Sequence, residues 1–257
     1  MQQMLSPKEI ADATVNVGKY KTSKKDHIVF VSAMLAGAFV SLGYTGYLLI
    51  AGMLDGSPAG KIIGALAFPM GLMLILIAGA DLFTSNVLIT MAWFKKEIKG
   101  KQVIRNLVTV WVGNLVGALV FVALIYFSGL FSDSDTVKHY IEHVAEKKVH
   151  LPLMHLFFRG ILCNILVAVT VYMTYAAKNV QGKVLTLVLP IWVFVLTGFE
   201  HIVANMFVLP IGMLIGAPIN IGQMLYNFIP VTIGNLLGGM IIAFAYFFLF
   251  EREESSH

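Results

Sequence analysis

Long stretches without a charged residue dominate this sequence and restrict what it can fold into. Residues 28–54 and 106–132 each hold 27 residues without Asp, Glu, Lys or Arg, and Asp81 is the only charged residue within 62–94. Soluble chains carry about 25% charged residues, whereas only 12% of this chain is charged. An apolar helix of about 20 residues crosses the hydrocarbon core of a membrane. The sequence therefore predicts an all-α membrane protein embedded in a lipid bilayer.

The uncharged stretches add up to six membrane spans. The fourth span lies within 151–177, and 184–250 is a run of 67 residues in which Glu200 and the adjacent His201 are the only Asp, Glu, Lys, Arg or His residues. The segment "GAPINIGQ" at 216–223 has the composition of a turn. This turn divides the long run into a fifth and a sixth span.

The second and fifth spans, 62–94 and 184–215, are too long for one straight helix each. They contain 33 and 32 residues, and each has an acidic residue near its middle, Asp81 or Glu200, two residues after a glycine. A carboxylate in a continuous membrane helix is costly, whereas irregular backbone is tolerated where it is buried in protein or lines a cavity. We therefore expect both helices to be broken at these acids.

The two halves of the chain repeat. The segment "GADLFTSN" at 79–86 aligns without gaps on "GFEHIVAN" at 198–205, and "GNLVGA" at 113–118 matches "GNLLGG" at 234–239. Each half has three spans, and an odd number reverses the orientation of the second half. The pattern predicts an inverted repeat whose breaks meet near the membrane midplane. The glycines of the second pair predict surfaces where helices pack closely.

The start of the chain and its basic residues predict how the protein is oriented. Ser6, Pro7 and Glu9 have the pattern of a helix start, with Ser6 as N-cap and Glu9 three residues later. Thirteen Lys and Arg residues fall on the side of the N-terminus and five on the other, which places both termini in the cytoplasm. Because the basic residues orient the protein in this way, the net charge of +4 does not indicate nucleic-acid binding.

These observations divide the chain into five parts. They are a cytoplasmic amphipathic N-terminal helix within 1–27, a first three-helix repeat at 28–132, an outer loop at 133–150, a second three-helix repeat at 151–250 and a cytoplasmic tail at 251–257.

The breaks would bring helix starts into the membrane interior. A half-helix that begins there presents unpaired N–H groups and the positive end of its dipole, so two such starts can form a site for a small anion. Asp81 and Glu200 would repel an anion. We expect them to accept hydrogen bonds from the loops and to hold the broken helices in place, with a proton relay as the alternative.

Three further polar residues are candidates for the pathway. His201 is the only histidine deep in a span, where it can donate a hydrogen bond or a proton to a passing anion. Asn164 is a second polar group in the membrane, with a hydrogen bond between helices as an equal alternative. Lys148 in the outer loop could draw anions toward the entrance, or it could be an ordinary solvated lysine.

The pentapeptide "HYIEH" at 139–143 matches the H-x-x-E-H pattern of a zinc-peptidase helix. Such a site needs two histidines on one buried face, a third ligand and a cleft. Here the pentapeptide lies in a charged outer segment. We therefore expect no metal, no cofactor and no enzymatic activity.

Three segments resemble the formate/nitrite transporter family. The segment "LIAGADLFTS" at 76–85 is similar to the first signature of that family, and "GILCNILVAV" at 160–169 is similar to the second. The segment "GFEHIVANMF" at 198–207 resembles the stretch around the central histidine of the family. The resemblance spans essentially the whole chain and is strongest to the hydrosulfide channel branch.

This resemblance implies an aquaporin-like protomer of six transmembrane helices, assembled as a homopentamer with one pore per protomer in the cell (inner) membrane. It implies passage of small monovalent anions, with Thr84 and His201 flanking a central site, Asn164 close by and Lys148 as the outer-loop lysine. Apolar constrictions are implied at Phe68, Leu72, Leu82, Phe83, Val167 and Phe194.

The favoured function is a pore for hydrosulfide, with formate or nitrite as further candidates. Transient protonation by His201 would let the anion of a weak acid cross a constriction as a neutral species. A proton-coupled secondary transporter would use the same residues and is the first alternative. The second is a neutral-solute channel of the aquaporin type, but the chain lacks the paired Asn-Pro-Ala turns of that class.

Overall fold

A computed structural model describes residues 4–251. Within this range the secondary structure is helical, apart from one isolated bridge between Met4 and Ala177. The elements are α1 (Pro7–Ser23), α2 (Asp26–Met53), α3 (Pro58–Ala65), α4 (Pro69–Leu74), the π-helical turn η1 (Ile75–Gly79), α5 (Phe83–Asn86), the 3₁₀ turn η2 (Val87–Ile89), α6 (Thr90–Phe94), α7 (Gly100–Ser128), α8 (Asp135–Val149), α9 (Leu153–Thr174), α10 (Val180–Leu196), α11 (Ile202–Ile215) and α12 (Ile221–Phe250).

The helices form six membrane crossings. Four of them are the single helices α2, α7, α9 and α12, and each is long and apolar enough to span a membrane. The second crossing runs through α3, α4 and η1, is interrupted, and continues through α5, η2 and α6. The fifth consists of α10 and α11 on either side of a second interruption. The predicted fold, with six spans of which the second and fifth are broken, is confirmed.

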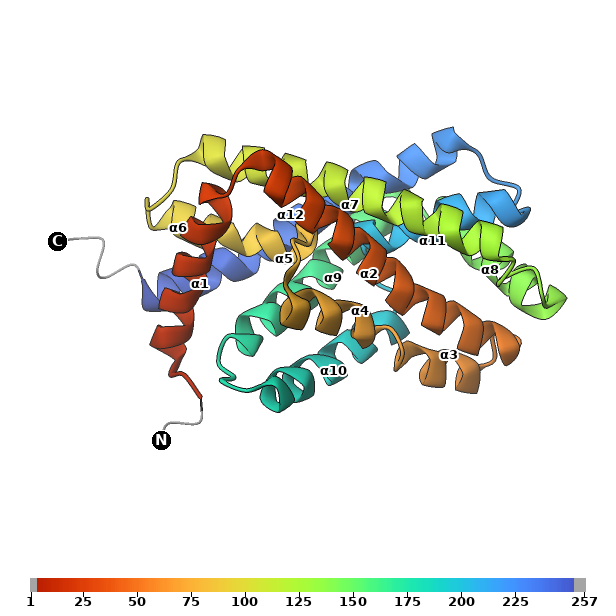
Figure 1. Cartoon of the computed structure of the whole chain (residues 1–257), viewed down its shortest axis with the longest axis horizontal. Helices are drawn as coiled ribbons and strands as arrows, with labels where there is room; N and C mark the ends of the chain where they lie inside the picture. The colour runs from red at the N-terminus through yellow and green to blue at the C-terminus, as the bar shows by residue number, and fades with distance from the viewer. Residues whose placement is uncertain (1–3, 252–257) are drawn as a thin grey trace.

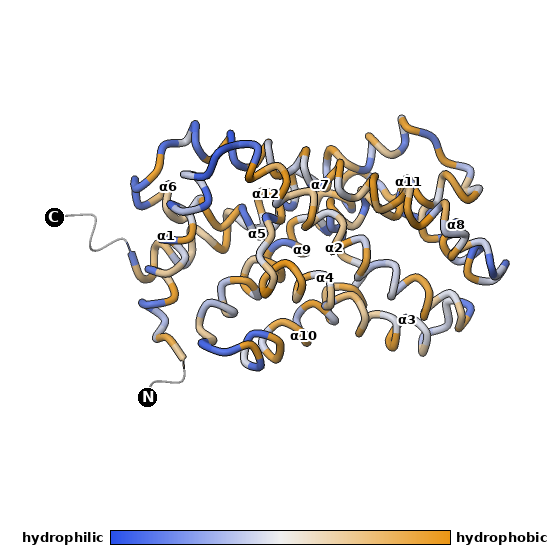
Figure 2. Tube along the Cα trace, in the orientation of Figure 1, coloured by the Kyte–Doolittle hydropathy of each residue, from blue (hydrophilic) through white to orange (hydrophobic). Residues whose placement is uncertain are grey.

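The two ends of the molecule differ. The described start and end of the chain lie with α1 and α6 at one end, and α3 and α8 lie at the other (Figure 1). We call these ends the terminal side and the α8 side. Apolar residues fill most of the helices between them, and dense hydrophilic segments lie at both ends (Figure 2). Apart from Glu251, the predicted tail lies outside the described residues, as do residues 1–3.

The structure contains two amphipathic helices outside the crossings. The first, α1, begins where predicted: the Ser6 N–H donates to Glu9 Oε2 at 2.7 Å and the Glu9 N–H to Ser6 Oγ at 3.4 Å. The second, α8, lies within the segment expected to be an outer loop and buries Val137, Ile141 and Ala145. These three apolar residues recur at i, i+4 and i+8, and this helical periodicity is the signal that could have revealed α8.

Each break begins at a glycine in the left-handed region. The backbone φ is 89° at Gly79 and 67° at Gly198, a conformation that glycine adopts at no steric cost. No other atom comes within 4 Å of a Cβ placed on either glycine, so backbone conformation rather than space explains the choice of residue. The helical turn η1 ends at Gly79 itself, whereas α10 ends at Leu196, two residues before Gly198.

An asparagine from α7 satisfies the backbone of the first break. Asn114 Oδ1 accepts from the Phe83 N–H, the first N–H of α5, at 2.8 Å. Its Nδ2 donates to Asp81 O at 3.0 Å and to Ala33 O in α2 at 2.8 Å. One amide side chain thus joins the interruption and the first residue of α5 to a neighbouring crossing.

Asn235 of α12 repeats this arrangement at the second break. Its Oδ1 accepts from the Ile202 N–H at 2.9 Å, and its Nδ2 donates to Glu200 O at 2.9 Å and to Gly160 O at 2.8 Å. The N–H groups of Phe83 and Ile202 are therefore paired with protein. This corrects the expectation that the first N–H groups of the half-helices are free to bind an anion.

The glycines of the "GNL" segments allow these asparagines to reach the breaks. A Cβ on Gly113 would lie 2.8 Å from Phe30 O in α2, and one on Gly234 would lie 3.1 Å from Gly160 Cα in α9. The predicted close packing is confirmed at these positions. Each glycine directly precedes a capping asparagine, so the close approach of the helices brings the amide within hydrogen-bonding distance of the break.

Replacement of Asn235 should destabilise the fold strongly. Asn235→Leu keeps the volume similar but removes the partner of one buried N–H and of two buried carbonyls. Each unpaired buried group costs about 1–3 kcal/mol, so we expect a total loss above about 2 kcal/mol. The decrease in the unfolding temperature of the detergent-solubilised protein measures this effect.

Asn179→Leu is the matched control for this prediction. Asn179 Oδ1 also caps a helix start, accepting from the Gly182 N–H at 2.7 Å, but at an exposed site. Water replaces the lost partner there, and the cap is worth about 1 kcal/mol. Equal destabilisation by the two substitutions would contradict the role assigned to Asn235.

Candidate functional site

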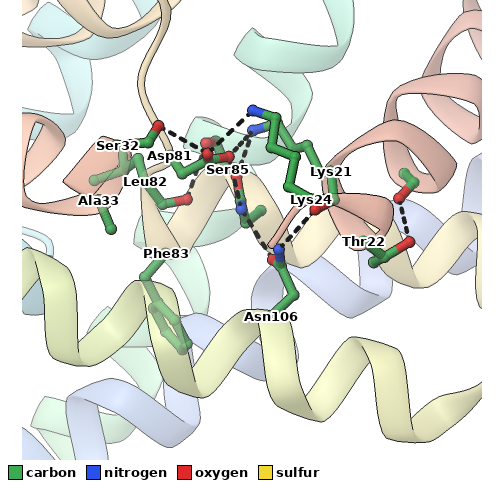
Figure 3. Close-up of polar contacts among 12 residues, drawn as sticks. Lys21, Thr22, Lys24, Ser32, Ala33, Asp81, Leu82, Phe83, Ser85 and Asn106 are labelled. Carbon is green, nitrogen blue, oxygen red and sulfur yellow. Dashed lines mark hydrogen bonds and ion pairs between the residues drawn. The ribbon is translucent and has the colours of Figure 1, made fainter. Parts of the chain in front are cut away.

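The carboxylate of Asp81 is buried and fully engaged by side chains from the terminal side. It accepts from Ser32 Oγ at 2.8 Å and from Asn86 Nδ2 at 3.1 Å, and the ammonium groups of Lys21 and Lys24 approach it at 3.1 and 3.5 Å (Figure 3). Burial lowers the pKa of Lys21, and the charge of Asp81 acts in the opposite direction. This arrangement suits the predicted function of Asp81 in holding the broken helix.

Glu200 has a corresponding environment on the α8 side, with one lysine in place of two. Its carboxylate is buried and accepts from Lys148 Nζ at 2.9 and 3.0 Å, and from Asn205 Nδ2 at 2.7 Å. Lys148 was expected either to attract anions or to be solvated. The structure instead pairs its charge with a carboxylate, and its side chain is only 14% exposed.

Asn106 of α7 and Asn227 of α12 connect the regions of the two acids to the amphipathic helices. Asn106 Nδ2 donates to the Lys21 carbonyl in α1 at 3.2 Å, and Asn227 Nδ2 donates to the Lys148 carbonyl in α8 at 3.0 Å. Helices α1 and α8 are therefore equivalent parts of the two repeats. An alignment without gaps misses this, because 85 residues separate the first pair and 79 the second.

Thr84 and His201 meet between the two breaks. Both are buried, and Thr84 Oγ1 lies 2.9 Å from His201 Nε2. His201 Nδ1 accepts from the Ala204 N–H at 3.1 Å and so caps α11. With Nδ1 occupied as an acceptor, the neutral ring carries its proton on Nε2 and donates it to Thr84 Oγ1. Among residues 4–251 the Thr84 hydroxyl has no acceptor of its own, so its hydrogen is available to a solute.

A cavity of about 400 Å³ on the α8 side reaches this pair. We call it the vestibule. His201 lines its floor, and Lys61, Lys147 and Arg159 line its wall. Within the described chain none of these three cations has a carboxylate within 4.0 Å. They supply the positive charge of the vestibule, and the sequence interpretation had singled out none of them for this purpose.

Aromatic rings line the vestibule beside the polar pair. The rings of Phe68 and Phe194 lie 5.3 Å apart in an edge-to-face arrangement, and Phe194 lies 5.9 Å from the His201 ring. Leu72 is buried one turn after Phe68. Three of the predicted constriction residues thus lie on the α8 side of the midpoint.

Two of the remaining predicted constriction residues lie at the first break, and the third, Val167, lies in α9. Leu82 and Phe83 are buried at the start of α5, which packs against α9, the helix that carries the buried Val167. On this side a hollow bounded by Lys21 of α1 and Ser85 of α5 has no room for a water molecule. The pathway is therefore wide on the α8 side and closely packed toward α1.

Asn164 forms a bond between helices. Its Nδ2 donates to the Asn235 carbonyl at 2.5 Å, and its Oδ1 has no partner among residues 4–251. The structure shows no hydrogen bond from Asn164 to Thr84 or His201 within that range. The geometry of Asn164 therefore favours a hydrogen bond between helices over a contact in the pathway.

The H-x-x-E-H segment forms no metal site. His139 and His143 are exposed on α8, and His139 Nδ1 lies 3.1 Å from Glu142 Oε2. Within residues 4–251 no group of three His, Cys, Asp or Glu side chains is placed to hold a metal ion.

Comparison with known proteins identifies the family. The profile described as formate/nitrite transporter matches residues 8–249. The chain is 36% identical to the formate channel FocA of Haemophilus influenzae over 92% of this chain and 91% of that one. It is 34% identical to the Escherichia coli protein of the same name over 99% and 97%.

Solved structures agree with the sequence comparison. A pentameric formate channel with formate bound superposes with a TM-score of 0.80 at 30% identity, covering 87% of this chain and 96% of that one. A second structure, an FNT family ion channel, gives 0.82 at 26% identity over 95% and 98%. The chain is a multi-pass membrane protein of a transport family and not an enzyme. It belongs to the formate/nitrite transporter family.

Proposed function

We propose that each protomer is a pore for small monovalent anions of weak acids, with hydrosulfide, formate and nitrite as the candidate substrates. The observation that carries this proposal is the buried Thr84–His201 pair, which lies between apolar constrictions and below a cationic vestibule. We further propose a homopentamer in the cell (inner) membrane, with both termini cytoplasmic. The pentameric neighbour supports the assembly, and the excess of Lys and Arg on the terminal side supports the orientation.

The vestibule and the constriction act in sequence on the anion. Lys61, Lys147 and Arg159 raise the local concentration of anions. Lys148 is committed to Glu200, so in this proposal its main function is to fasten the second break. At Phe68 and Phe194 the anion loses water, which costs many kcal/mol for a bare charge. The Thr84 hydroxyl, polarised by the proton that His201 Nε2 donates to it, offsets part of that cost at the midpoint.

The contact between His201 and α11 bears on proton transfer. Loss of the Nε2 proton to an anion would leave an imidazolate unless Nδ1 gained a proton at the same time. A proton on Nδ1 would displace the Ala204 N–H from its acceptor. The geometry therefore supports hydrogen-bond donation more directly than protonation of the anion, and proton-coupled transport is the alternative to be tested.

Two observations bear on which anion the proposed pore carries, and they point to different anions. The resemblance of the sequence favours hydrosulfide, whereas the relatives compared above carry names that refer to formate. All three candidates are small and singly charged, so they satisfy the charge and width of the pathway equally. The choice among them needs a contact that distinguishes oxygen from sulfur.

An anion panel tests the proposed function. The purified protein in liposomes should carry hydrosulfide, formate and nitrite as charge down a potassium diffusion potential, without water or glycerol flux. Lumenal pH, recorded together with charge, separates a pore from a symporter. Net charge movement without matching proton entry is expected, and electroneutral entry with one proton per anion would contradict a pore.

His201→Phe should reduce anion flux by a factor of about 10 to 100, because a hydrogen bond to a charged group contributes about 1.5–3 kcal/mol. The phenyl ring neither donates to Thr84 nor caps α11. His143→Phe makes the same change at an exposed position of the vestibule wall and should leave the flux within about twofold. Unchanged flux in His201→Phe, with its pH dependence also unchanged, would refute the midpoint mechanism.

Lys148 and Lys147 should have separable functions. Lys148→Met leaves the buried Glu200 without its cation, and breaking a buried pair costs about 3–5 kcal/mol. We therefore expect a large decrease in the unfolding temperature in detergent. Lys147→Met should leave that temperature unchanged and lower anion flux at low salt but not at high salt. If Lys148→Met affected only the salt-dependent flux, Lys148 would be an attracting residue and not a fastener.

A further inference from the structure

Tyr44 of α2 places an unpaired hydroxyl in the wall of the vestibule. The residue is 7% exposed and lines the same cavity as His201. Within residues 4–251 no hydrogen bond joins this hydroxyl to the protein. Among the side-chain nitrogen and oxygen atoms of that range, only Asn164 Oδ1 and Asn205 Oδ1 are both fully buried and unpaired. The unpaired Tyr44 hydroxyl is therefore not fully buried, and it is accessible from the cavity.

Packing holds the Tyr44 ring beside the aromatic constriction. The ring meets Phe68 edge-to-face at 5.5 Å and stacks on Tyr47 at 5.5 Å, and its centroid lies 6.4 Å from Phe207. Phe68 in turn contacts Phe194, the ring next to His201. Tyr44 thus lies beside the rings that the proposed pathway passes between the vestibule and the midpoint.

Several other polar groups near this point have partners in the protein. The hydroxyls of Tyr47 and Tyr140 bond each other at 2.9 Å, and Lys148 is held by Glu200. The unpaired cations of the vestibule wall attract any anion and do not distinguish oxygen from sulfur. The Tyr44 hydroxyl differs from these groups because it is rigidly positioned and has no partner in the described chain.

We propose that the Tyr44 hydroxyl donates a hydrogen bond to the anion at the entrance of the Phe68–Phe194 constriction, and that this contact favours oxyanions such as formate and nitrite over hydrosulfide. Ionised oxygen accepts short, strong hydrogen bonds from a hydroxyl, whereas sulfur is a weak acceptor. The inference rests on the proposed function, since it specifies which anion that pathway selects.

The test compares Tyr44→Phe with the wild-type protein in liposomes, with anion entry counted as charge. Tyr44→Phe removes one oxygen atom and retains the ring packing. We expect the half-saturating formate concentration to rise about tenfold, and that for hydrosulfide to change less than about threefold. Tyr47→Phe is the matched control, because Tyr140 still offers a hydroxyl there, and it should leave both values within about twofold.

Three outcomes would overturn the inference, and they differ in meaning. An equal change for formate and hydrosulfide in Tyr44→Phe, or an equal effect of Tyr47→Phe, would refute the Tyr44 contact and leave the proposed function standing. A wild-type protein that carries none of the anions would refute the proposed function and this inference with it. If Tyr44→Phe did not fold, Tyr44→Gln and Tyr44→Met would give the same comparison, since only glutamine retains an N–H donor.

Discussion

The structure depends on keeping backbone hydrogen bonds satisfied at two interruptions inside the membrane. Water is not available in the hydrocarbon core to replace a missing partner, so each freed N–H or C=O must find one in the protein. Asn114 and Asn235 do this with one amide apiece, each bonding an N–H after the break, a carbonyl within it and a carbonyl of a neighbouring crossing. The glycine before each asparagine is required because only a bare Cα lets the helices approach closely enough.

The acid clusters join this backbone arrangement to the two faces of the membrane. Asp81 is bound by lysines of the terminal side and Glu200 by Lys148 of α8, so each amphipathic helix is fixed to a break by charge as well as by an asparagine. A buried carboxylate would be costly without a cation. The carboxylate and its lysine thus require each other, and their pairing sets the position of α1 and α8 over the two ends of the pathway.

The sequence predicted the crossings, both breaks and the inverted repeat. Hydropathy and the gap-free match of "GADLFTSN" with "GFEHIVAN" can be read from the order of residues, without knowledge of tertiary contacts. The sequence did not predict that Asn114 and Asn235 cap the half-helices, since the partners are 31 and 33 residues away in the chain. It also left Lys148 as either solvated or attracting, because its contact with Glu200 depends on α8, a helix whose apolar periodicity is weak. Tyr44 lies in a run of apolar residues and gave no signal of its own.

Comparison of the two repeats distinguishes the residues that hold the breaks from the residues of the proposed solute site. The halves match at the glycines, the acids and the asparagines. The glycine backbone forms each break, and the acid and asparagine side chains hold it together. The polar midpoint is built where they differ: His201 aligns with Leu82, and Thr84 aligns with the apolar Val203. An exact repeat of either half would replace His201 by leucine or Thr84 by valine, and the Thr84–His201 pair would be lost. The asymmetry gives a single donor pair, and the proposed pore requires a site that binds an anion strongly enough for it to enter and weakly enough for it to leave.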